Sequence, residues 1–86
     1  MRIYKKIAKN YFNDICKGIK TFELRQEDDC IYSVGDYIIL QEYVNNQYTK
    51  REIIVRIIYK LSSKEFPQAL KENWVILGIK KESEVL

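Results

Sequence analysis

Histidine is absent from this 86-residue chain, and cysteine occurs only twice, as Cys16 and Cys30. Without histidine the chain cannot build a Ser-His-Asp triad, a Cys-His catalytic pair or a histidine-rich zinc site. The two cysteines form neither a CxxC pair nor a disulfide framework. Neither a signal peptide nor a long apolar span is present. We therefore expect a cytoplasmic protein with reduced thiols, no membrane attachment and no bound metal.

The length is sufficient for one domain, residues 1–86, and too small for a second domain or a deep cofactor crevice, so we expect no cofactor. Apolar residues make up 47% of the chain, and its aromatic residues are seven Tyr, three Phe and one Trp. This composition is typical of a well-packed globular protein and not of a disordered one.

The net charge of +3 is mild, but its distribution is uneven. The first twenty residues contain six basic side chains and only one acidic side chain, Asp14. This asymmetry is compatible with a surface for nucleic acid and equally with a solvated helix face. The acidic run 27–29 follows directly, so the surface is mixed, and we interpret that run as a polar loop and not as a metal site.

Hydrophobic periodicity predicts a helix over residues 9–18 and a strand over residues 21–25. Apolar residues recur at helical spacing at Ala8, Tyr11, Phe12, Ile15, Cys16 and Ile19. Gly18 supplies the residue type that readily takes the left-handed conformation ending a helix. The period then changes to two, so the strand would turn Phe22 and Leu24 to one face and its polar side chains to the other.

The remaining chain predicts mainly strands and turns. We expect a short strand at 1–4, a polar loop at 26–34, a turn at 34–36, strands at 37–44 and 48–61 joined by a hairpin connection at 45–47, a helix start at 62–65 with a short helical segment at 66–71, and a last strand at 74–80. This order indicates an α+β fold: a small mixed β-barrel capped by one main helix and a short second helix.

The segment 18–25 contains the strongest functional signal, because three charged residues fall where the helix gives way to a strand. Lys20 is a mobile point charge, Arg25 is a rigid fork for phosphate or carboxylate, and Glu23 can orient both or accept from a base or amide edge. The same spacing is also that of a surface ion network. A third interpretation makes Lys20, Thr21 and Glu23 the catalytic residues of an amidase-like site.

Aromatic and basic residues further along the chain extend the candidate site. Tyr43 and Trp74 could offer faces on which unpaired bases stack, although Tyr43 near Tyr48 is also explained by ordinary cross-strand packing. Arg51, in the second strand of the predicted hairpin, could contact a phosphate backbone, or it could discourage edge pairing.

The pattern Gly18-x-Lys20-x-x-Glu23-x-Arg25 resembles the GxKxxExR signature of the activating-signal-cointegrator homology (ASCH) family, a branch of the PUA-like superfamily. The resemblance extends to Val34-Gly35-Asp36 before an apolar strand, to Glu42-Tyr43, to the run 48–52 and to 74–79, so it covers about nine-tenths of the chain. It is similar in particular to small bacterial and phage members classed as a domain of unknown function. Lys50 stands where the pattern of these small relatives has Gly, and the early histidine of the family is missing.

The resemblance implies a PUA-like β-barrel with a cleft between the barrel and the motif-bearing segment, and recognition of RNA or a modified nucleotide. A related subfamily hydrolyses N4-acetylcytidine with Lys and Thr spaced as K-x-x-T and a distant Glu. Lys20 matches that spacing, but Glu23 occupies the Thr position, and Thr21 could replace it only with displaced geometry. Glu65 or Glu72 would be the distant carboxylate.

Three hypotheses follow from the sequence. The first is a module that binds RNA or a nucleotide through Lys20, Glu23 and Arg25, and is not an enzyme. The second is a small amidohydrolase acting on an N-acylated nucleoside. The third is a protein-interaction domain that uses the edge of the barrel and no cleft.

Overall fold

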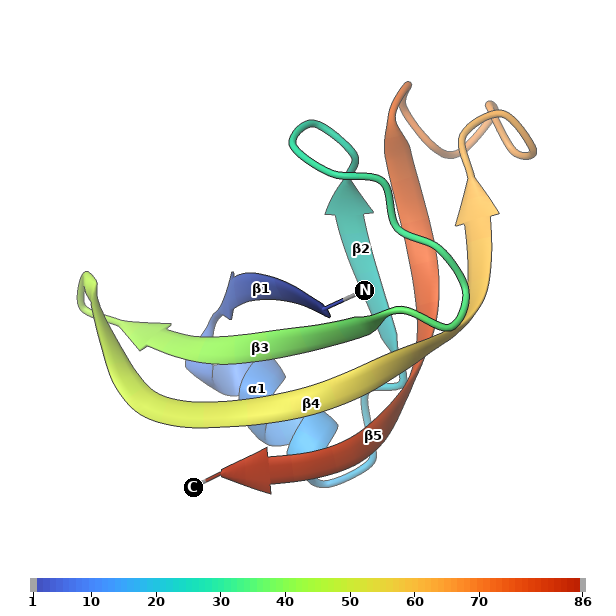
Figure 1. The fold of residues 1–86 in the computed structure, drawn as a ribbon. Coiled ribbons are helices and arrows are strands. Elements are labelled where there is room, and N and C mark those ends of the chain that lie inside the picture. The colour runs from blue at the N-terminus through green and yellow to red at the C-terminus, as the bar shows by residue number, and fades with distance from the viewer. Residues whose placement is uncertain (1, 86) are drawn as a thin grey trace.

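The computed structural model describes residues 2–85, which form five strands and one helix (Figure 1). The elements are β1 (Arg2–Ile7), α1 (Lys9–Cys16), β2 (Phe22–Gln26), β3 (Tyr37–Val44), β4 (Gln47–Ser62) and β5 (Trp74–Val85). None of the helical residues in this described range forms a segment long and apolar enough to cross a membrane.

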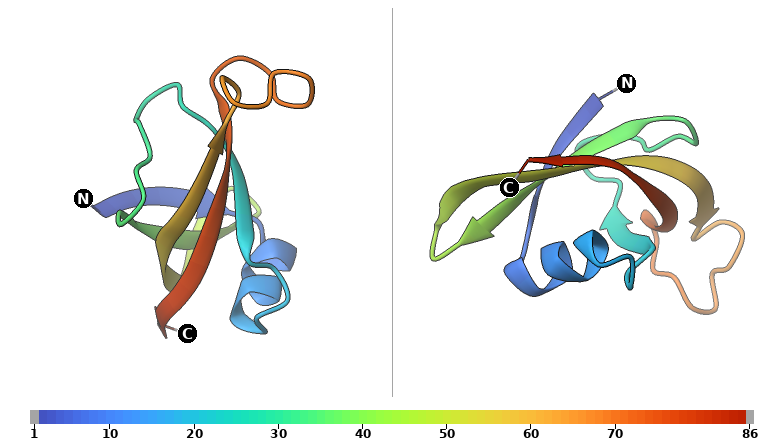
Figure 2. Two further views of the ribbon diagram at one scale, coloured as in Figure 1. Left: turned by 90° about the vertical axis from the view of Figure 1, so that its right-hand side faces the viewer. Right: turned by 90° about the horizontal axis from the view of Figure 1, so that it is seen from below.

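All five strands belong to one sheet in the order β1-β3-β4-β5-β2. The β1–β3 pair is parallel and the other three pairs are antiparallel, so the sheet is mixed. The sheet curls strongly, and α1 lies against one side of it (Figure 2). Because β1 and β2 are its two edges, the barrel predicted from the sequence is a half-barrel with an open seam.

The curl has a local cause in the two longest strands. The pairing of β4 with β5 shifts register between Ile54 and Val55 and again between Ile57 and Tyr59. Such bulges bend a strand and increase its twist. At the second bend Gly78 lies so close to β4 that an added Cβ would stand 3.1 Å from the Tyr59 Cβ, which explains a glycine inside this strand.

The core lies inside the curl. Side chains that alternate along β3, β4 and β5 meet Phe12 and Ile15 of α1 and Tyr32 of the loop after β2. Phe12 and the inward side chains at the centre of the sheet are fully buried: Ile38, Leu40, Ile53, Val55, Ile57 and Leu77. The helix is therefore held to the sheet by only one turn of apolar residues.

The helix ends as the glycine predicts, two residues earlier than expected. Gly18 has φ +76°, and its amide bonds the Ile15 carbonyl while the Ile19 amide bonds the Asp14 carbonyl, the paired arrangement of a Schellman cap. The apolar stripe predicted for the helix was wrong at Tyr11 and Ile19, because both side chains are exposed.

Three other predictions need correction. The short second helix at 66–71 is wrong, since residues 63–73 form successive turns; Glu65 bonds Ser62 as in a capping box, but no helix follows. The first strand runs from Arg2 to Ile7, beyond the expected 1–4, and Met1 lies outside the described residues. The last strand continues past Lys80 to Val85.

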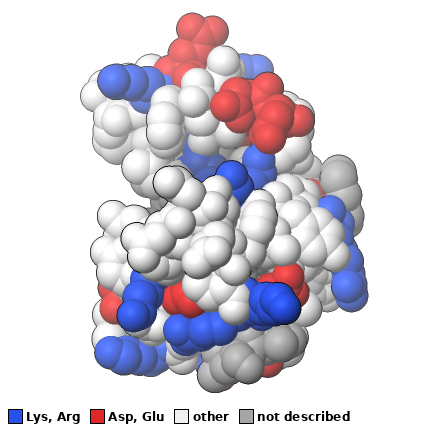
Figure 3. Space-filling model, turned by 90° about the vertical axis from the view of Figure 1, so that its left-hand side faces the viewer, with Lys and Arg blue, Asp and Glu red and all other residues white. Residues whose placement is uncertain are grey.

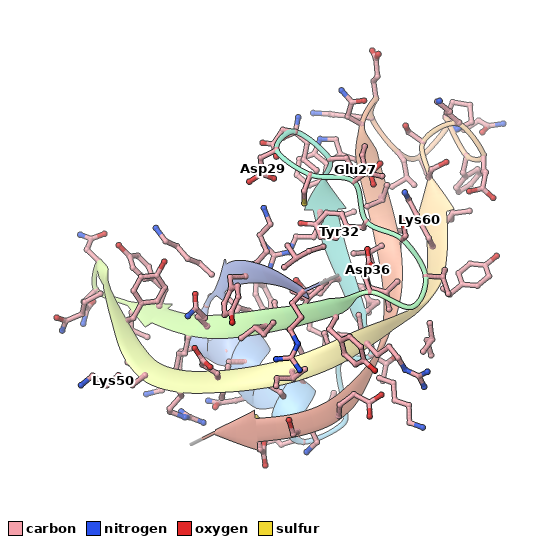
Figure 4. The ribbon with its side chains drawn as sticks, viewed as in Figure 1. Glu27, Asp29, Tyr32, Asp36, Lys50 and Lys60 are labelled. Carbon is pink, nitrogen blue, oxygen red and sulfur yellow. The ribbon has the colours of Figure 1, made fainter. Side chains whose placement is uncertain are left out.

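The β3–β4 hairpin is confirmed, and it contains a strained residue. Asn45 and Asn46 form the turn with positive φ, and the rings of Tyr43 and Tyr48 meet edge to face at 4.9 Å. Two residues later in β4, Lys50 has φ +75°, the left-handed region that favours glycine. The side chain of Lys50 extends away from the sheet into solvent (Figure 4).

Replacing Lys50 with glycine should stabilise the protein. A left-handed conformation costs a side-chain-bearing residue about 1–2 kcal/mol, and the extra unfolded-state entropy of glycine cancels only part of the gain. We expect Lys50→Gly to raise the free energy of unfolding by about 0.5–1 kcal/mol in urea titrations. Lys64→Gly, at an exposed turn residue without positive φ, is the control and should lower it. A Lys50→Gly variant less stable than wild type would show that the backbone of Lys50 is not strained.

Candidate functional site

Glu23 is one of two buried acidic residues in the described chain and binds two basic side chains at once. It is only 4% exposed. Its Oε1 accepts from the Lys20 ammonium, and its Oε2 accepts from Arg25 Nε at 2.8 Å and Nη2 at 2.7 Å. Lys20 also donates to the Phe22 carbonyl. The three motif residues form one ion cluster, and it is not a surface network.

The register of β2 explains this burial. Glu23 pairs with Leu77 and Arg25 pairs with Val75, so both charged side chains lie on the inner face of the sheet with the core. Phe22 and Leu24 consequently turn outward and are 50% and 52% exposed. A strand that buries its acid and exposes its large apolar residues is unusual, and exposed apolar surface is a common feature of binding sites.

The ion cluster lies at the open seam of the half-barrel. Arg25 Nη2 reaches from β2 to the Lys6 carbonyl on the edge of β1, at 3.2 Å. Lys5 of β1 bonds both carboxylate oxygens of Asp29, in the loop after β2, at 2.8 Å. The hydrogen bond from Lys5 lowers the pKa of Asp29. These side-chain contacts join the edges that no strand pairing closes.

A pocket of about 470 Å³ opens on this seam. Its lining comes from the end of β1, from α1, and from β2 with the segment before it: Lys6, Ile7, Ala8, Tyr11, Lys20, Phe22, Glu23, Leu24 and Arg25. In the space-filling view the surface is hollowed midway down one margin, and Lys and Arg atoms gather at the inner edge of that hollow (Figure 3). This volume lies within the range of small-molecule binding sites.

Two rings stand beside the Lys20 ammonium. Its Nζ lies 5.4 Å from the centre of the Tyr11 ring and 4.8 Å from that of Phe22, and both side chains are half exposed. These are distances at which a cation is attracted to an aromatic face. The pocket therefore combines a fixed positive charge with aromatic surface open to solvent.

The other sequence candidates lie outside this pocket. Thr21 is exposed and is not among the residues that line it. Tyr43 is connected to the pocket by Lys6, a lining residue whose ammonium lies 4.2 Å from the centre of the Tyr43 ring. Trp74 lines two neighbouring pockets. Glu65 lines a further pocket, with Lys60, and Glu72 is exposed in the turns after β4.

Arg51 belongs to a second internal cluster. It donates to Glu42, which is 2% exposed, at 3.2 Å, and its guanidinium carbon stands 4.6 Å from the centre of the Phe12 ring. Thr49 donates to the same carboxylate at 2.7 Å. The bulge around Lys50 places both donors opposite Glu42, since the register passes from Gln41–Glu52 to Tyr43–Tyr48. In the described structure Arg51 thus helps to join β3, β4 and α1.

The loop between β2 and β3 is also anchored by an ion pair between Lys60 and Glu27. Lys60 of β4 donates to Glu27 at 2.8 Å and to the Tyr32 carbonyl at 2.6 Å. The Tyr32 amide donates to Glu27 as well, at 2.8 Å. Figure 4 shows Glu27, Asp29, Tyr32 and Asp36 spread along this loop and Lys60 on the strand beside it. The acidic run is a loop, as expected from the sequence.

Neither cysteine belongs to the first pocket. Burial raises the pKa of the Cys16 thiol to about 11, and hydrogen bonding to Glu84 adds to the effect. Cys16 packs against the core, as its place in the helical pattern predicts, and a protonated thiol is a poor nucleophile. Cys30 also packs partly against the core.

Sequence reasoning predicted three of the nine residues that line the pocket and missed the other six. Lys6 was counted only as one of several basic residues, and Tyr11 was assigned to the buried stripe of the helix. The exposed side of Phe22 and Leu24 was not assigned to a site. A signal was available in the motif itself, because charges on the inner face of β2 force its apolar residues outward.

Comparison with protein families identifies one match. Residues 4–79 match a family described as a domain of unknown function (DUF3850). The match spans most of the chain, so the chain belongs to this family. No curated protein matches it.

Proposed function

We propose that this protein is an ASCH-type, PUA-like module that binds single-stranded RNA or a modified nucleotide in the pocket between β1, α1 and β2. The observation that supports this most directly is the buried Glu23, which holds Lys20 and Arg25 together on the wall of a pocket flanked by exposed rings.

The positively charged groups have donors to spare. Lys20 has three N–H donors and uses them on two acceptors, Glu23 and the Phe22 carbonyl. Arg25 engages Glu23 and the Lys6 carbonyl through Nε and Nη2, and its Nη1 bonds none of the described residues. With Glu23 ionised the cluster has one net positive charge, which matches one phosphodiester. The remaining N–H groups would bond its non-bridging oxygens.

The rings provide the second half of the recognition. Single-stranded nucleic acid is bound by a positive surface that follows the backbone and by aromatic faces that stack unpaired bases. Tyr11 and Phe22 both lie close to the Lys20 ammonium, so a base could stack on either ring while its phosphate meets the cation. A base paired within a duplex has no free face for this.

Binding of labelled oligonucleotides tests the proposal. We expect fluorescence anisotropy to detect single-stranded RNA binding that weakens with salt, with a slope of log K against log salt of about −0.7 for one phosphate. Lys20→Ala/Arg25→Ala should reduce affinity by at least about tenfold, because both cations that contact this phosphate are lost. Lys64→Ala/Lys80→Ala removes the same net charge from exposed positions outside the pocket and should change affinity less than about threefold.

A conservative variant separates geometry from charge. Arg25→Lys keeps the positive charge but loses the planar fork that bonds Glu23 twice. It should remain folded in circular dichroism and bind severalfold more weakly than wild type. Equal affinity in wild type, Arg25→Lys and the folded double variant would refute this site.

A further inference from the structure

A second pocket adjoins the first across Leu24 and Arg25, which line both. It has a volume of about 310 Å³ and is lined by Lys5, Leu24, Arg25, Gln26, Asp28, Asp29, Tyr32 and Trp74. Lys5 and Arg25 stand against Asp28 and Asp29, and Arg25 is also paired with Glu23, so this pocket has no surplus of positive charge. A pocket with several polar groups and no positive surplus suits a neutral polar ligand better than a phosphate.

Tyr32, which lines this pocket, supplies an independent observation. The residue is 1% exposed, yet its buried hydroxyl has no hydrogen-bond partner within ordinary geometry among the described residues. A buried hydroxyl without a partner is costly for folding, and such groups are rare in native structures. Burial, with the neighbouring Cys30 thiol, raises the pKa of the hydroxyl, so it remains a neutral donor. The charges that influence it include Arg25 and Asp29, which line the same pocket.

The remaining groups provide both kinds of hydrogen-bonding partner. Asp28 is exposed and bonds none of the described residues, so its carboxylate is free to accept two hydrogen bonds. Asp29 is occupied by Lys5. Arg25 Nη1 carries two N–H groups, so one can donate in each pocket, and the Tyr32 hydroxyl has no partner among the described residues. Trp74 adds an aromatic side chain that is partly exposed.

We propose that this second pocket is a base-reading subsite for guanine, placed beside the phosphate-binding pocket. Guanine is the base with two adjacent donors, N1–H and the N2 amino group, which match a carboxylate such as Asp28. It also presents the acceptors O6 and N7, which match Arg25 and the Tyr32 hydroxyl. Uracil lacks the amino group and N7. The subsite rests on the proposed function, because the first pocket must hold the neighbouring phosphate.

Substituted oligonucleotides test the subsite. The probes are labelled single-stranded RNA octamers of uridine, alone or with one central guanosine or one central inosine, which lacks the N2 amino group. We expect wild type to bind the guanosine octamer about tenfold more tightly than the uridine octamer, with inosine between them. Tyr32→Phe and Asp28→Asn should each reduce the guanosine preference to less than about threefold while leaving uridine binding unchanged.

Two controls complete the design. Tyr59→Phe and Asp14→Asn make the same chemical changes outside this pocket and should retain the preference. Thermal unfolding of Tyr32→Phe should occur at or above the wild-type temperature, because the hydroxyl has no partner to lose.

The possible failures are distinguishable. Uridine and guanosine octamers bound equally, or a preference that survives both Tyr32→Phe and Asp28→Asn, would overturn the guanine subsite while leaving the first pocket intact. Clear destabilisation of Tyr32→Phe would also overturn it, since the hydroxyl would then be bonded within the protein. Absence of binding to every octamer would refute the proposed function and the subsite together.

Discussion

Glu23→Gln should lower the free energy of unfolding by about 3 kcal/mol, because removing one partner of a buried ion cluster leaves the others uncompensated. Lys20 and Arg25 would remain with side chains only 13% and 21% exposed and no carboxylate to bond. A small domain of this length has under about 10 kcal/mol of stability, so the loss is a large share. Urea titration with a common slope for both proteins measures it.

An exposed ion pair provides the matched control. Glu82→Gln makes the same change in the pair with Arg56, where the two side chains are 37% and 41% exposed. Exposed pairs contribute less than about 1 kcal/mol, so this variant should differ little from wild type. Equal costs for Glu23→Gln and Glu82→Gln would show that Glu23 does not compensate the two cations.

Removing the whole cluster should cost much less than breaking it. Buried ion clusters replaced by apolar residues of similar size are often neutral for stability. We expect Lys20→Met/Glu23→Leu/Arg25→Met to unfold within about 1 kcal/mol of wild type and to lose RNA binding. That combination would separate the cluster's role in binding from any role in folding, because the fold would persist without it.

The central strands could be predicted from the sequence because their signals are local. Residues 37–44 and 48–61 are rich in branched and aromatic side chains, and two asparagines between them tolerate the positive φ of the turn. Gly18 likewise fixed the end of the helix, since few other residues take φ +76° without strain. The antiparallel centre of the sheet and its main helix follow from these elements.

The pairing of the edges could not be read locally. The parallel partnership of β1 with β3 joins residues separated by more than thirty positions, and nothing in residues 2–7 specifies it. The short helix predicted at 66–71 was wrong because here a local signal was present but misleading. Ser62 and Glu65 have the residue types of a capping box, but the chain around Pro67 takes successive turns instead.

The site was predicted in part for the same physical reasons. Spacing placed Glu23 and Arg25 on one face of a strand, and the structure keeps them there. Which face is buried depends on the β2–β5 register, a long-range property. Tyr11 lines the pocket because the buried residues of α1 are Phe12 and Ile15, which leaves Tyr11 on the exposed side of the helix. Arg51 pairs instead with Glu42, an acid whose burial the alternation of β3 could have indicated.

Phe12→Ala should cost about 3–4 kcal/mol, which is typical of truncating a fully buried aromatic side chain. Phe12 is 0% exposed and joins α1 to the sheet with Ile15. An eight-residue helix is too short to persist without such packing, so its attachment should weaken with the core. Tyr11, next to it on the helix, would then lose its fixed place beside Lys20.

This variant connects stability to binding. At temperatures where most Phe12→Ala protein remains folded, RNA affinity should fall by about threefold or more although Lys20, Glu23 and Arg25 are intact, because one stacking face is no longer held in place. Phe66→Ala, at a side chain 44% exposed in the turns after β4, is the matched control and should cost less than about 1 kcal/mol with affinity unchanged. Full affinity in folded Phe12→Ala would show that α1 is not part of the binding surface and that β2 alone provides the contacts.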